Sequence, residues 1–140
     1  MAKRGAGGDI FVGELRPARS AYRIQTTPTF EDGLKELGRS DAERLYAKIQ
    51  QFERHWRGGL SEPDLTRMFD YKALNGSEYK KWGVRQLTLL RNFRVILTDI
   101  PSLNPPIMYY AWTFRKTRQN DKVETNRGML ICKSIRERLL

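Results

Sequence analysis

Arginine and lysine side chains stand on three strand-like segments in the second half of the chain, where they could bind or cleave a phosphodiester. Arg85 follows an apolar residue in GVRQLTLL, Arg94 stands near the start of FRVILTDI, and the third segment ends with Arg115, Lys116 and Arg118. A guanidinium grips a phosphate through two parallel hydrogen bonds, and fixed positive charge stabilises a phosphorane-like transition state. If the three segments are neighbouring strands, these groups could converge on one concave basic surface.

Aromatic residues and further lysines accompany this set. Tyr110 and Trp112 lie on the third segment, and Lys80 and Lys81 precede the first. Aromatic faces stack on unpaired bases while a positive groove follows the backbone of single-stranded RNA. We therefore expect Tyr110, Trp112, Lys80, Lys81 and Arg118 to contact RNA. Each also has a structural interpretation, because aromatic residues that alternate on a strand place at least one face in the core, and the lysines could be solvated loop charges.

Other groups that carry chemistry are scarce. The chain has one histidine, His55, and one cysteine, Cys132, so neither a two-histidine ribonuclease mechanism nor a Cys/His zinc site can be built. It contains no GxxxxGK[ST] loop, no GxGxxG, no HExxH and no nucleophile elbow. We expect no metal and no cofactor. Cys132 stands beside Leu130, Ile131 and Ile135 and is expected in the core.

The charge of the chain indicates a polyanionic partner. Its 140 residues include 26 Lys and Arg against 16 Asp and Glu, which gives a net charge of +10. Such an excess attracts nucleic acid, an anionic membrane surface or an acidic protein, although it could also only keep a surface solvated. For one domain of this length we favour nucleic acid. No apolar run resembles a signal peptide or a membrane-spanning helix, so we expect a soluble, cytoplasmic protein.

The start of the chain differs in composition from the rest. Residues 1–20 are rich in Gly, Ala and Arg without a sustained period, and we expect them to form a basic flexible arm. Residues 21–140 are expected to form the folded domain. Its first segment, residues 21–27, has the β-branched and aromatic content of a strand.

Two helices are predicted next. Thr27 can cap a helix that Gly38 ends, and Ser40 with Glu43 reads as a capping box for a second helix that ends at Gly58. Apolar residues recur at helical spacing behind both caps. The two helices are expected to form a helical hairpin.

The chain then changes to the period of strands. Segments 69–76, 83–90, 93–100 and 107–117 are strand-like and joined by turns or loops, and a last amphipathic helix follows near Asp121. The expected order is strand, helix, helix, three strands, helix. This order predicts an α+β fold, β-α-α-β-β-β-α, with a small, mostly antiparallel sheet packed on the helical hairpin.

The stretch from residue 21 to the end resembles the RelE/ParE toxin superfamily, in particular its HigB-like, phage-associated branch. The pieces that carry the resemblance are, in order, TPTFEDGLKEL, YKALNG, WGVRQL, FRVIL and TFRKTRQ, followed by the last helix. The resemblance implies a RelE-like fold and the toxin of a type II toxin–antitoxin system. It implies metal-independent cleavage of messenger RNA in the ribosomal A site, with the 2′-hydroxyl attacking the adjacent phosphate, and a cognate antitoxin in a hetero-oligomer.

The same resemblance assigns roles to the basic residues. Arg94 matches the arginine that holds the scissile phosphate, and Arg85, with Lys81, matches basic residues of the preceding strand. Arg115 or Lys116 would protonate the leaving oxygen or stabilise the phosphorane. The general base is not assigned, because Gly83 stands where some relatives carry a lysine and no tyrosine follows residue 110.

Two other functions remain open at this point. One is a basic nucleic-acid-binding module without catalysis, and the other is a gyrase inhibitor of the ParE kind on the same fold. Arg94 could also form a structural ion pair with Asp99 or Glu78 rather than bind a phosphate. Arg85, Arg94 and Lys116 on adjacent strands favour cleavage, because a surface that binds only protein does not need them.

Overall fold

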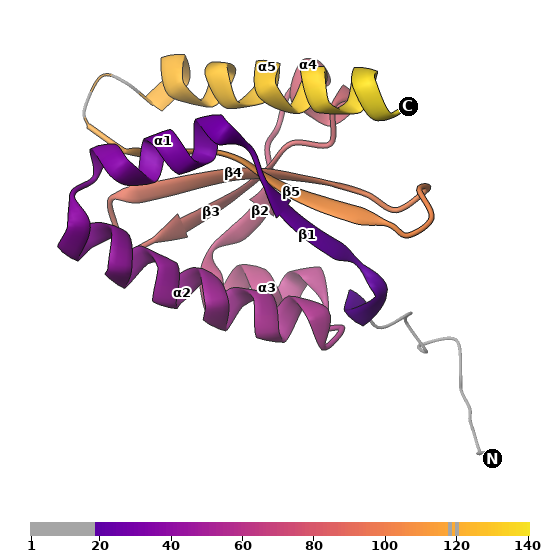
Figure 1. Cartoon of the computed structure of the whole chain (residues 1–140), viewed down its shortest axis with the longest axis horizontal. Coiled ribbons are helices and arrows are strands. Elements are labelled where there is room, and N and C mark those ends of the chain that lie inside the picture. Colours follow the sequence, from indigo (N-terminus) through magenta and orange to yellow (C-terminus); the bar gives the residue numbers. More distant parts are fainter. Residues whose placement is uncertain (1–18, 118, 120) are drawn as a thin grey trace.

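The computed structural model describes residues 19–117, 119 and 121–140, and it arranges them as a sheet between layers of helices (Figure 1). The elements, in chain order, are η1 Arg19–Ala21 (a 3-10 helix), β1 Arg23–Thr26, α1 Pro28–Glu36, α2 Arg39–Arg57, α3 Glu62–Phe69, β2 Tyr71–Ala73, α4 Ser77–Lys81, β3 Arg85–Leu89, β4 Phe93–Ile100, β5 Ile107–Arg115 and α5 Asp121–Leu139. The folded domain thus begins by Arg19; the rest of the expected arm, residues 1–18, lies outside the described residues.

The strands form one sheet in the order β1-β5-β4-β3-β2. The neighbours β5 and β4, β4 and β3, and β3 and β2 are antiparallel, whereas β1 runs parallel to β5. The expected α+β class and the mostly antiparallel sheet are therefore confirmed. Of the strand-like segment 69–76 only Tyr71–Ala73 pairs, as the short edge strand β2, which the expected order of three strands after the helices did not include.

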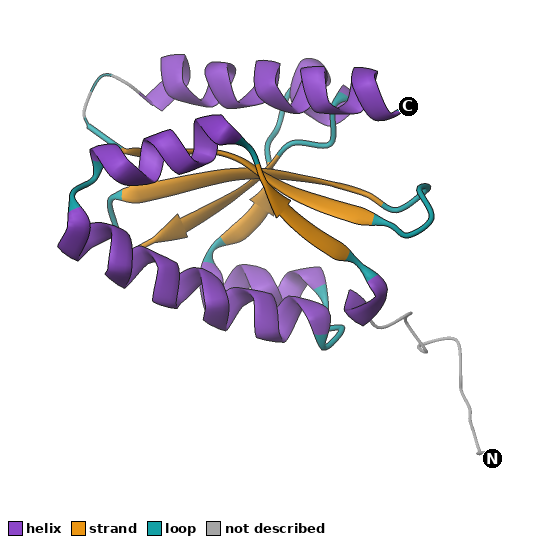
Figure 2. Ribbon diagram, viewed as in Figure 1, coloured by secondary structure: helices purple, strands orange, loops and turns teal. Residues whose placement is uncertain are grey.

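Helices cover both faces of this sheet (Figure 2). On the face that we call the α2 face, α1, α2 and α3 bury Phe30, Leu45, Ile49, Phe52, Trp56 and Leu65 against strand residues. On the opposite face, here the α5 face, α5 buries Cys132 and Ile135 against Ile96, Trp112 and Phe114. The sheet was expected to pack on the helical hairpin; α5 covers its other face, which the prediction left unassigned. The apolar character of β4 on both sides is the sequence signal of this two-sided burial.

Helix α1 extends the sheet edge where β1 stops. Strand β1 pairs with β5 only as far as Tyr110. The Thr27 hydroxyl then accepts from the Phe30 amide at 3.0 Å, which confirms the predicted cap, and donates to the Ala111 carbonyl at 2.8 Å. At Gly33 the helix passes so close to β5 that a Cβ would lie 2.6 Å from the Thr113 carbonyl oxygen. The outer edge of β5 is thus covered, which blunts it against pairing with another chain.

Three helix starts differ from the expectation. Helix α2 begins at Arg39 with Gly38 as its N-cap, and no side chain caps it, so the predicted capping box at Ser40 and Glu43 was wrong. Helices α3 and α4 were not predicted, because each spans only eight or five residues and shows too few turns for a period to emerge. Ser61 caps α3, its hydroxyl accepting from the amide of Asp64 at 3.2 Å.

Helix α5 was predicted correctly and lies close to β4. Gly128 is the point of contact, since a Cβ there would lie 2.8 to 2.9 Å from three side-chain atoms of Ile96. Cys132 is fully buried, as expected, and burial raises the pKa of its thiol to about 12. In the part of the chain that the structure describes, no helix has the length and apolar character needed to cross a membrane.

Candidate functional site

Two elements bring basic side chains to one end of the sheet. Phe93 pairs with Arg115 and Arg94 with Phe114 across β4 and β5, so the start of β4 lies beside the end of β5. The amide of Lys116 continues this pairing by donating to the Asn92 carbonyl at 2.6 Å. Arg91, in the turn between β3 and β4, is exposed at the same end. We call Arg91, Arg94, Arg115 and Lys116 the basic sheet end.

A β-bulge distributes these cations over both faces. The register shifts between Ile96 and Leu97, so that Ala111 of β5 is inserted without a partner. Tyr110 therefore lies in the core of the α2 face and Trp112 in that of the α5 face, although simple alternation places both on one side. Beyond the bulge Phe114 faces α5, and Arg115 returns to the α2 face.

Arg94 lies on the α5 face and has no carboxylate partner among the described residues. Its Nη1 donates to the carbonyl of Arg91 at 3.1 Å, a neutral contact within the turn. The ion pairs with Asp99 or Glu78 that the sequence left open are not formed. The guanidinium is half-buried at the mouth of the sheet end, and its remaining donors can meet an anion.

Arg115 is anchored on the opposite side. Its guanidinium lies 4.7 Å from the Phe93 ring centroid and 2.7 Å from a carboxylate oxygen of Asp41 in the first turn of α2. The hydrogen bond from Arg115 lowers the pKa of Asp41, and Arg44, at 3.2 Å, adds to the effect. Arg115 therefore ties α2 to β5 and presents a charge that is partly compensated.

The turn that carries Arg91 has an uncommon backbone. Leu90 and Arg91 have φ of 50° and 68°, in the left-handed region that side chains with a Cβ disfavour. The amide of Asn92 donates to the Leu90 carbonyl at 2.8 Å and closes the turn. This geometry aims the Arg91 carbonyl at Arg94 and leaves the Arg91 side chain exposed, a contribution to the site that the sequence analysis missed because turn residues have no period.

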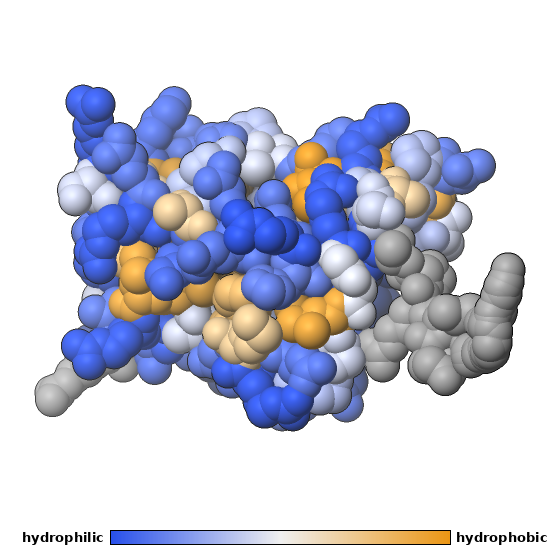
Figure 3. All heavy atoms as spheres, turned by 90° about the horizontal axis from the view of Figure 1, so that it is seen from below, coloured by the Kyte–Doolittle hydropathy of each residue, from blue (hydrophilic) through white to orange (hydrophobic). Residues whose placement is uncertain are grey.

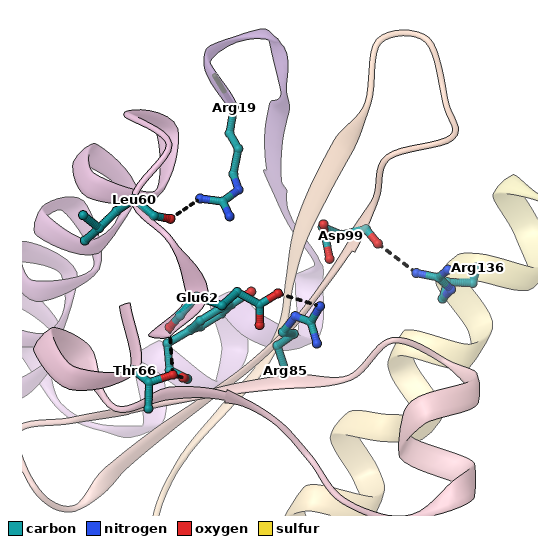
Figure 4. Close-up of polar contacts among 8 residues, drawn as sticks. Arg19, Leu60, Glu62, Thr66, Arg85, Asp99 and Arg136 are labelled. Carbon is teal, nitrogen blue, oxygen red and sulfur yellow. Dashed lines mark hydrogen bonds and ion pairs between the residues drawn. The ribbon is translucent and has the colours of Figure 1, made fainter. Parts of the chain in front are cut away.

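Arg85 lies elsewhere. It pairs with Leu97, three residues along the ladder from the Thr88–Arg94 pair, which is about 10 Å for a strand. Its side chain is on the α2 face, 3.2 Å from Glu62 and close to Tyr71 and Asp99 (Figure 4). The expected convergence of Arg85 with Arg94 therefore does not occur.

The surroundings of Arg85 are those of a structural ion cluster. Burial disfavours its charged form, but the Tyr71 hydroxyl and the carboxylates of Glu62 and Asp99 outweigh burial and raise the pKa of Arg85 above its ordinary value. Burial also disfavours the charged form of Tyr71, and because that form is the phenolate, the pKa of Tyr71 rises. Arg19, at the start of η1, donates to the Leu60 carbonyl at 2.9 Å beside this cluster. The cluster holds α3 against the sheet.

The aromatic side chains expected to stack on bases are in the core. Tyr110 is 2% exposed and its ring lies 5.4 Å from that of Phe30 at an interplanar angle of 25°. Trp112 is 8% exposed, with the Arg127 guanidinium 5.2 Å from its ring centroid. Neither presents an open face, because helices cover both sides of β5. The two rings therefore have no exposed face on which a base could stack, contrary to the expectation.

The remaining candidates are peripheral. Lys80 and Lys81 are exposed at the end of α4, and the Lys81 ammonium lies 5.0 Å from the Trp82 ring centroid. The Thr98 hydroxyl donates to the Trp82 carbonyl at 3.2 Å, which places this pair of lysines away from the Phe93 end of β4. Arg118 lies outside the described residues. Among the residues that are described, no group of three or more His, Cys, Asp or Glu side chains could hold a metal ion.

Comparison with protein-family models, with curated proteins and with solved structures finds no match to this chain in any of the three. What the fold and the site define is therefore a class: a strongly basic α+β domain whose sheet ends in a group of cations. Its function has to be inferred from these residues.

Proposed function

We propose that this protein is a ribosome-dependent messenger-RNA endonuclease, the toxin of a type II toxin–antitoxin system. The observation that carries the proposal is the basic sheet end, where Arg94, Arg115 and Lys116 stand at the same end of adjacent strands and Arg94 has no carboxylate partner among the described residues. A net charge of +10 supports a polyanionic substrate.

The chain order supports a RelE-like topology. Strand β1, helices α1 and α2, strands β3 to β5 and helix α5 follow one another in the expected order β-α-α-β-β-β-α. The helices α3 and α4 and the short edge strand β2 are additions between α2 and β3. The parallel pairing of β1 with β5 leaves the antiparallel β3-β4-β5 unit to carry the site.

We assign different roles to the two arginines and the lysine of the site, because only lysine readily gives up a proton. In the proposed reaction the RNA 2′-hydroxyl gives up its proton to solvent and its oxygen attacks the adjacent phosphorus, while the bond from phosphorus to the 5′-oxygen of the next nucleotide breaks. Arginine stays protonated, so Arg94 and Arg115 serve as fixed charge on the non-bridging oxygens. Lysine can release a proton, so Lys116 is the group that protonates the departing 5′-oxygen. Arg85, at the far end of the sheet, has a structural role and takes no part in the reaction.

The partners follow from this assignment. The substrate is messenger RNA in the ribosomal A site, in the cytoplasm, and an antitoxin segment neutralises the protein by covering the basic sheet end. An acidic segment fits best, because charge complementarity speeds the encounter with a protein of this charge.

The test is primer extension on a message translated in a purified system. Arg94→Ala and Lys116→Ala are expected to abolish the cuts, whereas Lys72→Ala, which removes an exposed lysine of the edge strand β2, leaves them unchanged. An intact message with wild-type protein would overturn the proposal. Salt-dependent RNA binding without cleavage would then favour the non-catalytic module, and inhibition of DNA supercoiling would favour a gyrase inhibitor.

A further inference from the structure

A cavity of about 440 Å³ opens between α2, α3 and the end of β3, and it is not part of the basic sheet end. This volume lies within the range of small-ligand pockets, about 300–1,000 Å³. Figure 3 views the side of the molecule that α2 and α3 cover and shows apolar surface exposed among hydrophilic side chains. Met68, which lines the cavity, is 53% exposed.

The floor and wall of this cavity are suited to a flat ring. Phe69 and His55 both line it, with ring centroids 5.5 Å apart and an interplanar angle of 46°. Phe52, buried below, contacts Phe69 edge-on at 5.7 Å and fixes its orientation. Every nucleobase has a π-face that can stack on such side chains, so this contact does not depend on the RNA sequence.

The rim of the cavity is polar and positive. Lys48, Gln51 and His55 follow one another at i, i+3 and i+7 on α2, so they stand along one side of the helix, and Arg54 lies beside them. The two cations can meet phosphates, and the Gln51 amide carries both a donor and an acceptor for a base edge. An apolar peptide side chain would form no hydrogen bond or ion pair with these rim residues.

The cavity adjoins the basic sheet end. Leu90, which lines it, is the turn residue before Arg91, and Thr88, which also lines it, is the register partner of Arg94. Arg94 itself is on the α5 face, so an RNA strand held at the sheet end would reach the cavity past the exposed Arg91 and past Arg115, which lies on the α2 face. The bulge supports this path, because it turns Arg115 toward the α2 face, where the cavity opens.

We infer that this cavity is a base-binding subsite for single-stranded RNA, which receives an unpaired base close to the phosphate held at the basic sheet end. The inference rests on the proposed function for the identity of the polymer. It replaces Tyr110 and Trp112, which are buried, by Phe69 and His55 as the stacking surface. The ligand class is a ribonucleotide within a strand rather than a free nucleotide, since the phosphate contacts are divided between the rim and the sheet end.

The test compares substitutions at two adjacent positions of α2, with the full chain and a short fluorescent single-stranded RNA. Gln51→Trp fills the cavity with a ring, Gln51→Ala leaves it open, and Gln50→Trp places the same ring at an exposed position that does not line it. Binding is measured by anisotropy for the RNA and for the same RNA with one abasic nucleotide at each position in turn. Circular dichroism shows whether each variant is folded.

The wild-type protein is expected to lose about tenfold in affinity when one particular base is removed, as for a single stacked base. Gln51→Trp should lose a similar factor with intact RNA and show no further loss with the abasic RNA. Gln50→Trp should behave like the wild type. If Gln51→Trp lowered the affinity for a polyglutamate peptide by the same factor as the affinity for RNA, the inference would be overturned in favour of an acidic protein partner.

Two results separate this inference from the proposed function. If Gln51→Trp binds RNA normally and wild-type protein still cuts messages, the subsite is refuted and the endonuclease stands. If the wild type shows the abasic effect but cuts no message, the subsite stands and the endonuclease is refuted. Absence of any RNA binding by the wild type would refute the subsite directly.

Discussion

Gly33→Ala is the sharpest test of the packing that positions the basic sheet end. Alanine favours a helix over glycine by about 1 kcal/mol, so helix propensity alone predicts a more stable protein. The structure predicts the opposite, because the new Cβ would lie 2.6 Å from the Thr113 carbonyl oxygen and 3.1 Å from its Cγ2. The carbonyl belongs to β5 and cannot rotate away, so α1 has to move.

The size of the effect follows from these two contributions. Overpacking of a tight contact costs about 1–3 kcal/mol. Because the neighbour is backbone, we expect the upper part of this range, and subtracting the gain in helix propensity leaves a net destabilisation of about 1–2 kcal/mol. With an m-value of about 2 kcal/mol per molar urea, the midpoint falls by about 0.5–1 M.

The assay is urea unfolding followed by tryptophan fluorescence, for which the chain has three tryptophans, including Trp112 next to Thr113. Ser134→Ala, at an exposed position of α5, is the matched control, and its midpoint should rise slightly by helix propensity. If Gly33→Ala raised the midpoint as the control does, the close approach of α1 to β5 would be refuted, and with it the account of how the end of β5 is held.

Three further results are expected. Arg85→Ala should lower the urea midpoint and leave message cleavage intact. Arg94→Ala should leave the urea midpoint unchanged and abolish cleavage. Loss of cleavage in both variants would return Arg85 to the site. The pKa of Asp41 is lowered by Arg115, so its ion pair stabilises the fold fully above the ordinary value of 3.8 and is lost as pH falls below it; Asp41→Asn should therefore flatten acid unfolding in that range, and an unchanged curve would contradict this. The thiol of Cys132, whose pKa burial raises to about 12, should react with a disulfide reagent only after urea is added.

The parts of the fold that could be predicted are the helices and strands long enough for their hydrophobic pattern to repeat several times. The stripe Leu45, Ile49, Phe52 and Trp56 lies in the core of the α2 face, and each of these residues is at most 2% exposed. Strand β4 alternates as expected, with Phe93, Val95 and Leu97 on the α2 face and Ile96 on the α5 face. These patterns recur over several helical turns or several strand residues, which is why the sequence predicts them.

The location of the site residues could be predicted only in part. Strand alternation gives the side of Arg94 correctly, but it does not say that Arg85 faces the other way from a neighbouring strand. That depends on the register of β3 with β4, which pairs Arg85 with Leu97 and is set by the short turn at Leu90. The cavity was missed for a similar reason, because α3, which supplies Phe69, is too short to show a helical period.

The β-bulge determines the arrangement of both the cations and the aromatic side chains at this end of the sheet. If Ala111 were paired regularly and no bulge formed, alternation from Tyr110 would place Arg115 on the α5 face beside Arg94, and two guanidiniums would crowd one side of the sheet end. With it, Arg94 and Arg115 stand on opposite faces, and a phosphate at the sheet end meets positive charge from both sides. The same shift divides Tyr110 and Trp112 between the two cores. The same bulge at Ala111 thus sets both the faces of the two buried aromatic rings and the faces of the two guanidiniums.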